Sequence, residues 1–83
     1  MKIPNENRHR EKMLMLLKDM RQKRGIRQVD LAERLGVPQS FISKYESGER
    51  QLEVLELRRI CQIMGVTFED FVRQLEAVIN EAE

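Results

Sequence analysis

Five hydrogen-bonding side chains recur on one side of a short segment, residues 38–48, which reads PQSFISKYESG. They are Gln39, Ser40, Ser43, Lys44 and Ser47. On a helix that advances about 100° per residue they fall within an arc of about 140°, while Pro38, Phe41, Ile42 and Tyr45 occupy the other side. Amide and hydroxyl groups both donate and accept hydrogen bonds, and the lysine adds a positive charge. The pattern predicts an amphipathic helix whose polar side either binds a polar ligand or is simply solvated.

Catalytic or metal-binding chemistry has little support elsewhere in the chain. Cys61 and His9 are the only cysteine and histidine, and they are far apart in the sequence. Cys61 recurs with an apolar helix face, so we interpret it as a small buried hydrophobe rather than a nucleophile. Metal sites need several ligands at fitting spacing, and the sequence offers no such set. We expect no enzyme, no metal site and no cofactor.

The composition is that of one small globular domain. The chain has 83 residues, of which 41% are hydrophobic and 35% charged. Its apolar runs are too short to cross a membrane, and no secretory signal is visible. A single cysteine excludes an intramolecular disulfide. We therefore expect a cytoplasmic protein with no membrane partner.

The charge is polarised along the chain. Residues 1–50 hold 12 Lys or Arg against 7 Asp or Glu, net +5, whereas residues 51–83 hold 3 against 7, net −4. This division permits an anionic partner at the basic half, although a solvated surface explains many such divisions equally well.

Periodicity and glycine positions predict five helices and no strand. Each of the four glycines, at 25, 36, 48 and 65, follows a segment with helical spacing. The predicted helices cover about residues 7–24, 28–35, 38–48 and 53–64, and a fifth starts at Thr67, which can cap it, and runs close to the C-terminus. The fold class is therefore all-α.

The second and third predicted helices form a distinct pair within QVDLAERLGVPQSFISKYES, residues 28–47. The first ends at Gly36, a turn of three residues follows, and Ala32 is small where the two helices must cross closely. This is helix-turn-helix spacing. A helix held outward by its neighbour can enter a DNA major groove, about 12 Å wide, and present side chains to base edges.

Two segments, GIRQVDLAERLGVPQSFISKYESGER and LRRICQIMGVTFEDF, make the chain resemble the Cro-like phage-repressor (XRE) family of helix-turn-helix DNA-binding proteins. The resemblance spans about Leu16 to Leu75. It implies a five-helix lambda-repressor-like domain, with the helix-turn-helix at helices two and three, that binds double-stranded DNA. We expect residues 1–83 to form this single domain, with a core over about 13–75 and a C-terminal helix extension over 76–83.

The resemblance also implies residue roles. The residues that face the groove and read bases are Gln39, Ser40, Ser43 and Lys44, and those expected at phosphates are Gln28, Arg27, Ser47 and Arg50. Gln39 could bond to adenine in bidentate fashion. Arg27 departs from the family pattern, which has a capping Ser or Thr there; arginine cannot cap, at a cost of about 1 kcal/mol.

Apolar residues continue along the fifth helix beyond the usual family core. Those predicted to form a dimer interface are Phe68, Val72, Leu75, Val78 and Ile79. Two interpretations stay open: the row packs on the first helix of its own chain, or it joins two chains. The dimer is favoured because one module buries only about 600–1,000 Å² on DNA. We expect a transcription regulator, a repressor that binds a two-fold operator as a homodimer; the alternatives are an antitoxin or an adaptor with a protein partner.

Overall fold

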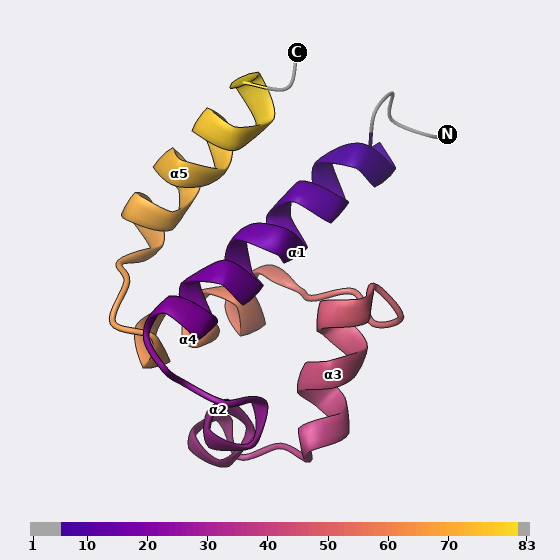
Figure 1. Ribbon diagram of the computed structural model, residues 1–83, viewed down its shortest axis with the longest axis vertical. Helices are drawn as coiled ribbons and strands as arrows, with labels where there is room; N and C mark the ends of the chain where they lie inside the picture. Colours follow the sequence, from indigo (N-terminus) through magenta and orange to yellow (C-terminus); the bar gives the residue numbers. More distant parts are fainter. Residues whose placement is uncertain (1–5, 82–83) are drawn as a thin grey trace.

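The structure, a computed structural model, describes residues 6–81 and contains five helices in that range (Figure 1). They are α1 Glu6–Lys23, α2 Gln28–Leu35, α3 Gln39–Ser47, α4 Val54–Ile63 and α5 Phe68–Glu81. Residues 6–81 include no β-strand, so the all-α prediction is confirmed. The predicted ends of all five helices lie close to the observed ones, and residues 82–83 of the predicted C-terminal extension lie outside the described residues.

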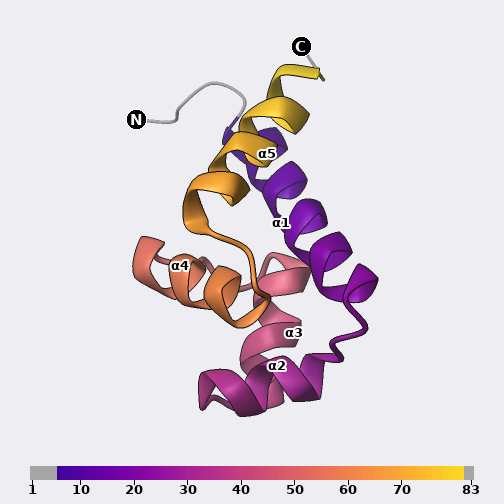
Figure 2. The same ribbon diagram turned by 90° about the vertical axis from the view of Figure 1, so that its left-hand side faces the viewer.

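The helices α1 and α5 run antiparallel and side by side, and α2 lies at the opposite end of the molecule from the start of α1 and the end of α5 (Figures 1 and 2). Contacts join α2 to α3 and to α4, and join α1 to α3 and to α5. The pair of α2 and α3 therefore stands at one end, held from behind by α1 and α4.

Each helix contributes side chains to one hydrophobic core. The fully or almost fully buried residues are Leu17, Met20, Leu31, Ala32, Ile42, Tyr45, Ile60, Cys61, Met64, Val66 and Phe71. On α1 and α3 the buried pairs are three residues apart, on α2 and α4 they are adjacent, and α5 contributes Phe71, so each helix buries one side against the others. Burial of these side chains, at about 25 cal/mol per Å² of apolar surface, is the main force that holds α3 in place.

Side-chain caps define where α4 and α5 begin. The Thr67 hydroxyl accepts a hydrogen bond from the Asp70 N–H at 3.1 Å, which confirms the predicted start of α5. At the start of α4, Glu53 and Glu56 each accept a hydrogen bond from the other's backbone N–H, at 2.9 and 3.0 Å. These caps satisfy N–H groups that would otherwise lack partners at the helix ends.

Two reactive side chains lie inside the core. Cys61 is fully buried, and burial raises the pKa of its thiol to about 11 because a thiolate is disfavoured away from water. The structure thus places Cys61 as the small buried hydrophobe that we expected. The Tyr45 hydroxyl is also buried and has no hydrogen-bond partner among residues 6–81; burial raises the pKa of this phenol above its usual range.

Candidate nucleic-acid interface

The polar side of α3 lies on the surface of the molecule. All five side chains predicted to share it are exposed: Gln39, Ser40, Ser43, Lys44 and Ser47. On the other side, Ile42 and Tyr45 are fully buried and Phe41 is partly buried. Pro38 was expected on the apolar side, but it is exposed because it precedes the helix as its N-cap residue. The described part of the chain therefore leaves the hydrogen-bonding face of α3 open to a ligand.

A tight turn sets the direction of α3 relative to α2. Gly36 has a φ of 77°, in the left-handed region that glycine adopts without strain. The N–H groups of Gly36 and Val37 both donate to the carbonyl oxygen of Ala32, at 2.9 and 3.0 Å. Pro38 then leads into α3 with a φ of −64°. Because backbone bonds close the turn, α3 keeps one orientation on α2.

A buried ion pair ties α3 to α1. The Arg21 Nε donates to Glu46 Oε2 at 2.7 Å, and Arg21 Nη2 donates to Glu46 Oε1 at 3.0 Å. Only 8% of the Arg21 side chain and 4% of the Glu46 side chain are exposed. Arg21 Nη1 also donates to the Ile26 carbonyl oxygen at 2.7 Å, in the turn before α2. One guanidinium therefore joins α1, α3 and the chain that leads into α2.

The same carboxylate reaches the predicted DNA-binding glutamines. Gln28 Nε2 donates to Glu46 Oε1 at 2.9 Å, and Gln39 Nε2 lies 3.5 Å from Gln28 Oε1, the outer limit of a hydrogen bond. Each glutamine amide has two N–H groups, so Gln28 keeps one N–H for a phosphate oxygen. Gln39 keeps its carbonyl oxygen and a second N–H, which are the groups that adenine recognition needs. The structure thus brings Gln28 and Gln39 together.

Two of the predicted serines, Ser43 in the middle of α3 and Ser47 at its end, bond to their own helix. Ser43 Oγ donates to the Ser40 carbonyl oxygen at 3.3 Å, and Ser47 Oγ donates to the Lys44 carbonyl oxygen at 3.0 Å. With its hydrogen so engaged, each hydroxyl presents acceptor lone pairs outward. In this state each serine hydroxyl can accept a hydrogen bond, and Ser47 would donate to a phosphate only after its hydrogen left the Lys44 carbonyl oxygen.

Arg50 is held beside the end of α3 by two contacts. Its Nη2 lies 3.1 Å from Glu56 Oε2, and its guanidinium carbon lies 4.3 Å from the centre of the Phe41 ring. Its backbone N–H donates to the Lys44 carbonyl oxygen at 3.1 Å. Stacking on an aromatic ring orients the planar guanidinium and keeps part of it exposed. A phosphate bound by Arg50 would therefore share the guanidinium with the Glu56 carboxylate.

The start of α2 is stabilised by Asp30, which bonds to the N-cap residue Arg27. The Asp30 carboxylate accepts hydrogen bonds from the Arg27 backbone N–H, from Arg27 Nε and from Arg27 Nη2, each at 3.0 Å. The Arg27 side chain thus gives no cap of its own, as predicted, but its charge is paired. These hydrogen bonds lower the pKa of Asp30 to about 2. The Arg27 side chain is 77% exposed, and its guanidinium retains unpaired N–H groups for a phosphate.

The residues predicted on α5 have different environments. Phe68 and Leu75 pack against the core of their own chain, and Val78 lines a hollow together with Met15 and Leu16 of α1. Val78 and Ile79 are half-buried, whereas Val72 is 40% exposed. Most of this row therefore packs within the chain.

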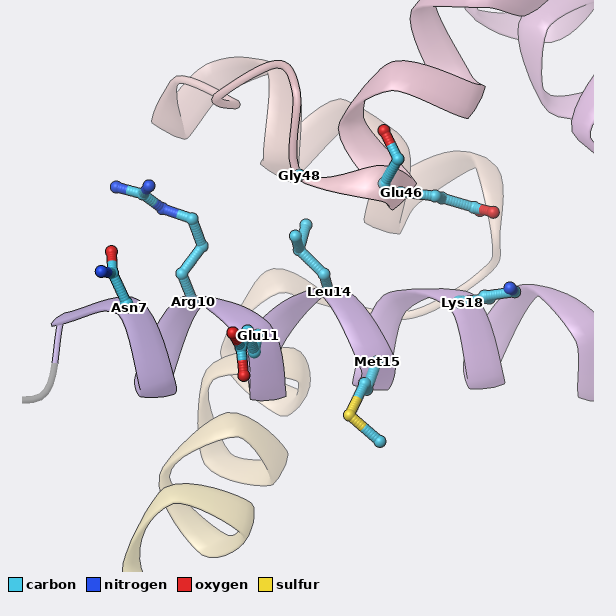
Figure 3. A pocket seen from close by; sticks show the side chains of 9 residues that line it. Asn7, Arg10, Glu11, Leu14, Met15, Lys18, Glu46 and Gly48 are labelled. Carbon is cyan, nitrogen blue, oxygen red and sulfur yellow. The ribbon is translucent and has the colours of Figure 1, made fainter.

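A hollow of about 590 Å³ lies between α1 and the end of α3 (Figure 3). Its lining residues are Asn7, Arg10, Glu11, Leu14, Met15, Lys18, Glu46, Ser47 and Gly48. Leu14 points toward Gly48 and stands between Arg10 and Lys18 (Figure 3). The hollow contains no histidine or cysteine, so it lacks a nucleophile–base pair of the kind that acyl transfer uses. Over residues 6–81 no group of three His, Cys, Asp or Glu side chains is placed to hold a metal ion.

Sequence reasoning missed the two residues that support this surface, Arg21 and Glu46. A signal for the first was present, since Arg21 continues the apolar face of α1 after Leu14 and Leu17 at three- and four-residue steps. A charged side chain on a core-facing position requires a buried partner. Nothing in the sequence identified Glu46 as that partner, 25 residues away.

Two short helices joined by a tight turn, the second with an exposed polar face, define a helix-turn-helix protein of the DNA-binding class. A helix-turn-helix family profile (HTH_3) matches residues 17–71. The chain is 42% identical to an XRE-family like protein from Pseudomonas syringae pv. tomato str. DC3000, over 87% of this chain and 88% of that one, with a TM-score of 0.82. No curated protein sequence matches.

A second solved structure, a point mutant of the restriction-modification controller protein C.Esp1396I, is 27% identical over 90% of this chain and 95% of that one, also with a TM-score of 0.82. The chain belongs to the XRE family of helix-turn-helix proteins, a family of DNA-binding transcription regulators rather than enzymes. No helix within residues 6–81 is long and apolar enough to span a membrane.

Proposed function

We propose that the protein is a repressor that binds a two-fold DNA operator as a homodimer in the cytoplasm. Each copy inserts α3 into a major groove, and the two half-sites lie about 10 base pairs apart. Repression follows because the bound dimer blocks access of polymerase to the promoter. The observation that carries the proposal is the exposed polar face of α3, which is fixed from behind by the buried Arg21–Glu46 pair.

Gln39 is the residue that we assign to sequence reading. It stands in the first turn of α3, where a recognition helix reaches base edges, and Gln28 limits the freedom of its amide. Ser40, Ser43 and Lys44 contact neighbouring positions. Because a good bidentate pair contributes about 1–3 kcal/mol of discrimination, Gln39→Ala should weaken binding to the preferred operator by about 5- to 150-fold.

Phosphate contacts supply most of the affinity and its dependence on salt. We assign them to Gln28, Arg27, Ser47 and Arg50, which border α3 at its two ends. Each neutralised phosphate adds about 0.9 to the slope of log affinity against log salt. Arg50→Ala should therefore weaken binding to all sequences alike and lower that slope by about 1.

A gel-shift titration tests the assignment at two salt concentrations, with operator and random duplexes. Asn80→Ala is the matched control, since it removes the same amide group from an exposed position at the far end of α5 (Figure 1). The proposal expects a loss of operator preference for Gln39→Ala and none for Asn80→Ala. An adaptor that binds only protein would show no DNA affinity that falls steeply with salt, and that result would overturn the proposal.

A further inference from the structure

Ser47, at the end of α3, offers no hydrogen to a DNA phosphate in this structure. Its hydroxyl donates to the Lys44 carbonyl oxygen, and the N–H of the next residue, Gly48, donates to the Tyr45 carbonyl oxygen. The C-terminal end of a helix also carries a partial negative charge, which repels phosphate. A DNA backbone that passes this end of α3 therefore needs a positive charge from a nearby side chain.

Two cationic side chains of α1 lie beside the end of α3. Arg10 and Lys18 line the hollow of about 590 Å³ whose other wall includes Ser47 and Gly48. Each is one helical turn from Leu14, which points toward Gly48 (Figure 3). A methyl group on Gly48 would lie 3.8 Å from Leu14 Cδ1, so α1 and the end of α3 are close here. Because Ser47 belongs both to this hollow and to the exposed polar face of α3, the hollow continues the surface that we assign to DNA.

The positive charges of Arg10 and Lys18 are available to a ligand. Lys18 is exposed and forms no ion pair with any residue from 6 to 81. Arg10 Nη2 lies 3.6 Å from Glu6 Oε1, and 32% of the Arg10 side chain is exposed. A partly exposed pair at this separation adds little stability, so a phosphate can replace the Glu6 carboxylate.

Acidic side chains do not cancel the positive charge of the hollow. Two of them line it, Glu11 and Glu46. Glu46 is already paired with Arg21 at 2.7 Å, so only Glu11 opposes the charges of Arg10 and Lys18. The excess of positive charge favours an anion, and the DNA backbone is the anion that the adjoining face of α3 brings to this place.

We infer that Arg10 and Lys18 bind the phosphate backbone of the operator beside the end of α3. The two residues are eight positions apart, which is about 12 Å along a helix, and a DNA strand carries a phosphate about every 3.4 Å of its axis. They therefore bind different phosphates. The inference rests on the proposed function and extends the DNA contact from the helix-turn-helix to α1. It gives a role to the first turns of α1, which precede the matched family region at residues 17–71.

The salt dependence of operator binding tests this contact. In gel-shift titrations, R10A/K18A should lower the slope of log affinity against log salt by about 1.8 for each copy bound, because two phosphate contacts are lost. Lys12→Ala is the matched control, since Lys12 also lies on α1 but lines the hollow between α1 and α5. It should leave the slope unchanged, and R10K/K18R, which keeps both charges, should also match the wild type. An unchanged slope for R10A/K18A, or an equal loss for Lys12→Ala, would overturn the inference.

Uncharged phosphates locate the contact on the DNA. The probes are operator duplexes that carry one methylphosphonate at a time along each strand. Two positions in each half-site should weaken binding of the wild type and have no effect on R10A/K18A; if no position behaves in this way, the inference is wrong. Circular dichroism checks that the double variant folds. If it does not, Lys18→Ala carries the same test, with a slope lower by about 0.9 and one such position.

The outcomes separate this inference from the proposed function. If Gln39→Ala loses operator preference while R10A/K18A matches the wild type in slope and in methylphosphonate profile, the inference fails and the reading role of α3 stands. If the wild-type chain has no DNA affinity that falls with salt, both fail.

Discussion

Removal of the Glu46 carboxylate is the most demanding test of the buried ion pair that joins α3 to α1. Glu46→Ala would leave the Arg21 guanidinium buried, with the Ile26 carbonyl oxygen as its remaining hydrogen-bond partner. Two hydrogen bonds to a charged group contribute about 1.5–3 kcal/mol each, and breaking a buried ion pair costs about 3–5 kcal/mol. We therefore expect the free energy of unfolding to fall by about 3–5 kcal/mol.

That loss is large for a chain of this size. At about 0.05–0.15 kcal/mol per residue, a chain of 83 residues has a total stability of about 4–12 kcal/mol. Urea denaturation followed by the circular dichroism of the helices measures the change, and an unaltered slope against urea shows that the change concerns stability alone. Glu49→Ala is the control, because Glu49 is an exposed glutamate just beyond the end of α3.

A double variant distinguishes an unpaired charge from a simple loss of packing. R21M/E46L replaces both charges with apolar side chains of similar size, so it should lie within about 1.5 kcal/mol of the wild type. If Glu46→Ala loses less than 1 kcal/mol, or if the double variant is as unstable as the single one, the buried pair does not fix α3 in the way described above.

Four smaller changes follow from the same geometry and are measured in the same denaturation assay. Tyr45→Phe should leave stability unchanged or raise it by up to about 1 kcal/mol, because the buried hydroxyl has no partner among the described residues; a loss above 1 kcal/mol would contradict this. Gly36→Ala should cost about 1–2 kcal/mol, since φ is 77° while a methyl group would meet no atom within 4 Å; a neutral result would refute the backbone argument. Thr67→Ala should cost about 1 kcal/mol through loss of the α5 cap, and Thr67→Ser should restore it. Hydrogen bonds lower the pKa of Asp30 in the folded chain to about 2, from an unfolded value of about 4. The charged carboxylate therefore stabilises the fold above pH 4, and this stabilisation is lost as the pH falls through 2. Asp30→Asn should make the free energy of unfolding depend less on pH between these two values.

The outline of the fold could be predicted from periodicity and from local end signals. The spacing of Leu31, Ile42 and Phe71 places each on a core-facing position, and the structure buries all three. Thr67 is followed directly by an amphipathic segment, so its role as a cap is a local property. The exposed arc of α3 follows from its sequence for the same reason, because helical geometry alone decides which residues share a side.

The connections among the site residues could not be predicted in this way. The contact of Glu46 with both Arg21 and Gln28 depends on how three helices pack, and the partners are 25 and 18 residues away in the sequence. The pairing of Arg27 with Asp30 was within reach, since a carboxylate three residues after the N-cap position is a known helix-start signal.

Selection of bound duplexes from a random library tests the central claim most directly, because it reports DNA binding, symmetry and base preference together. The wild-type chain should enrich a two-fold site with half-sites about 10 base pairs apart. Gln39→Ala should enrich the same site with preference relaxed at one symmetric pair of positions, and Asn80→Ala should match the wild type. An unenriched library, or a Gln39→Ala motif identical to that of the wild type, would contradict the assignment of α3 as the surface that reads DNA.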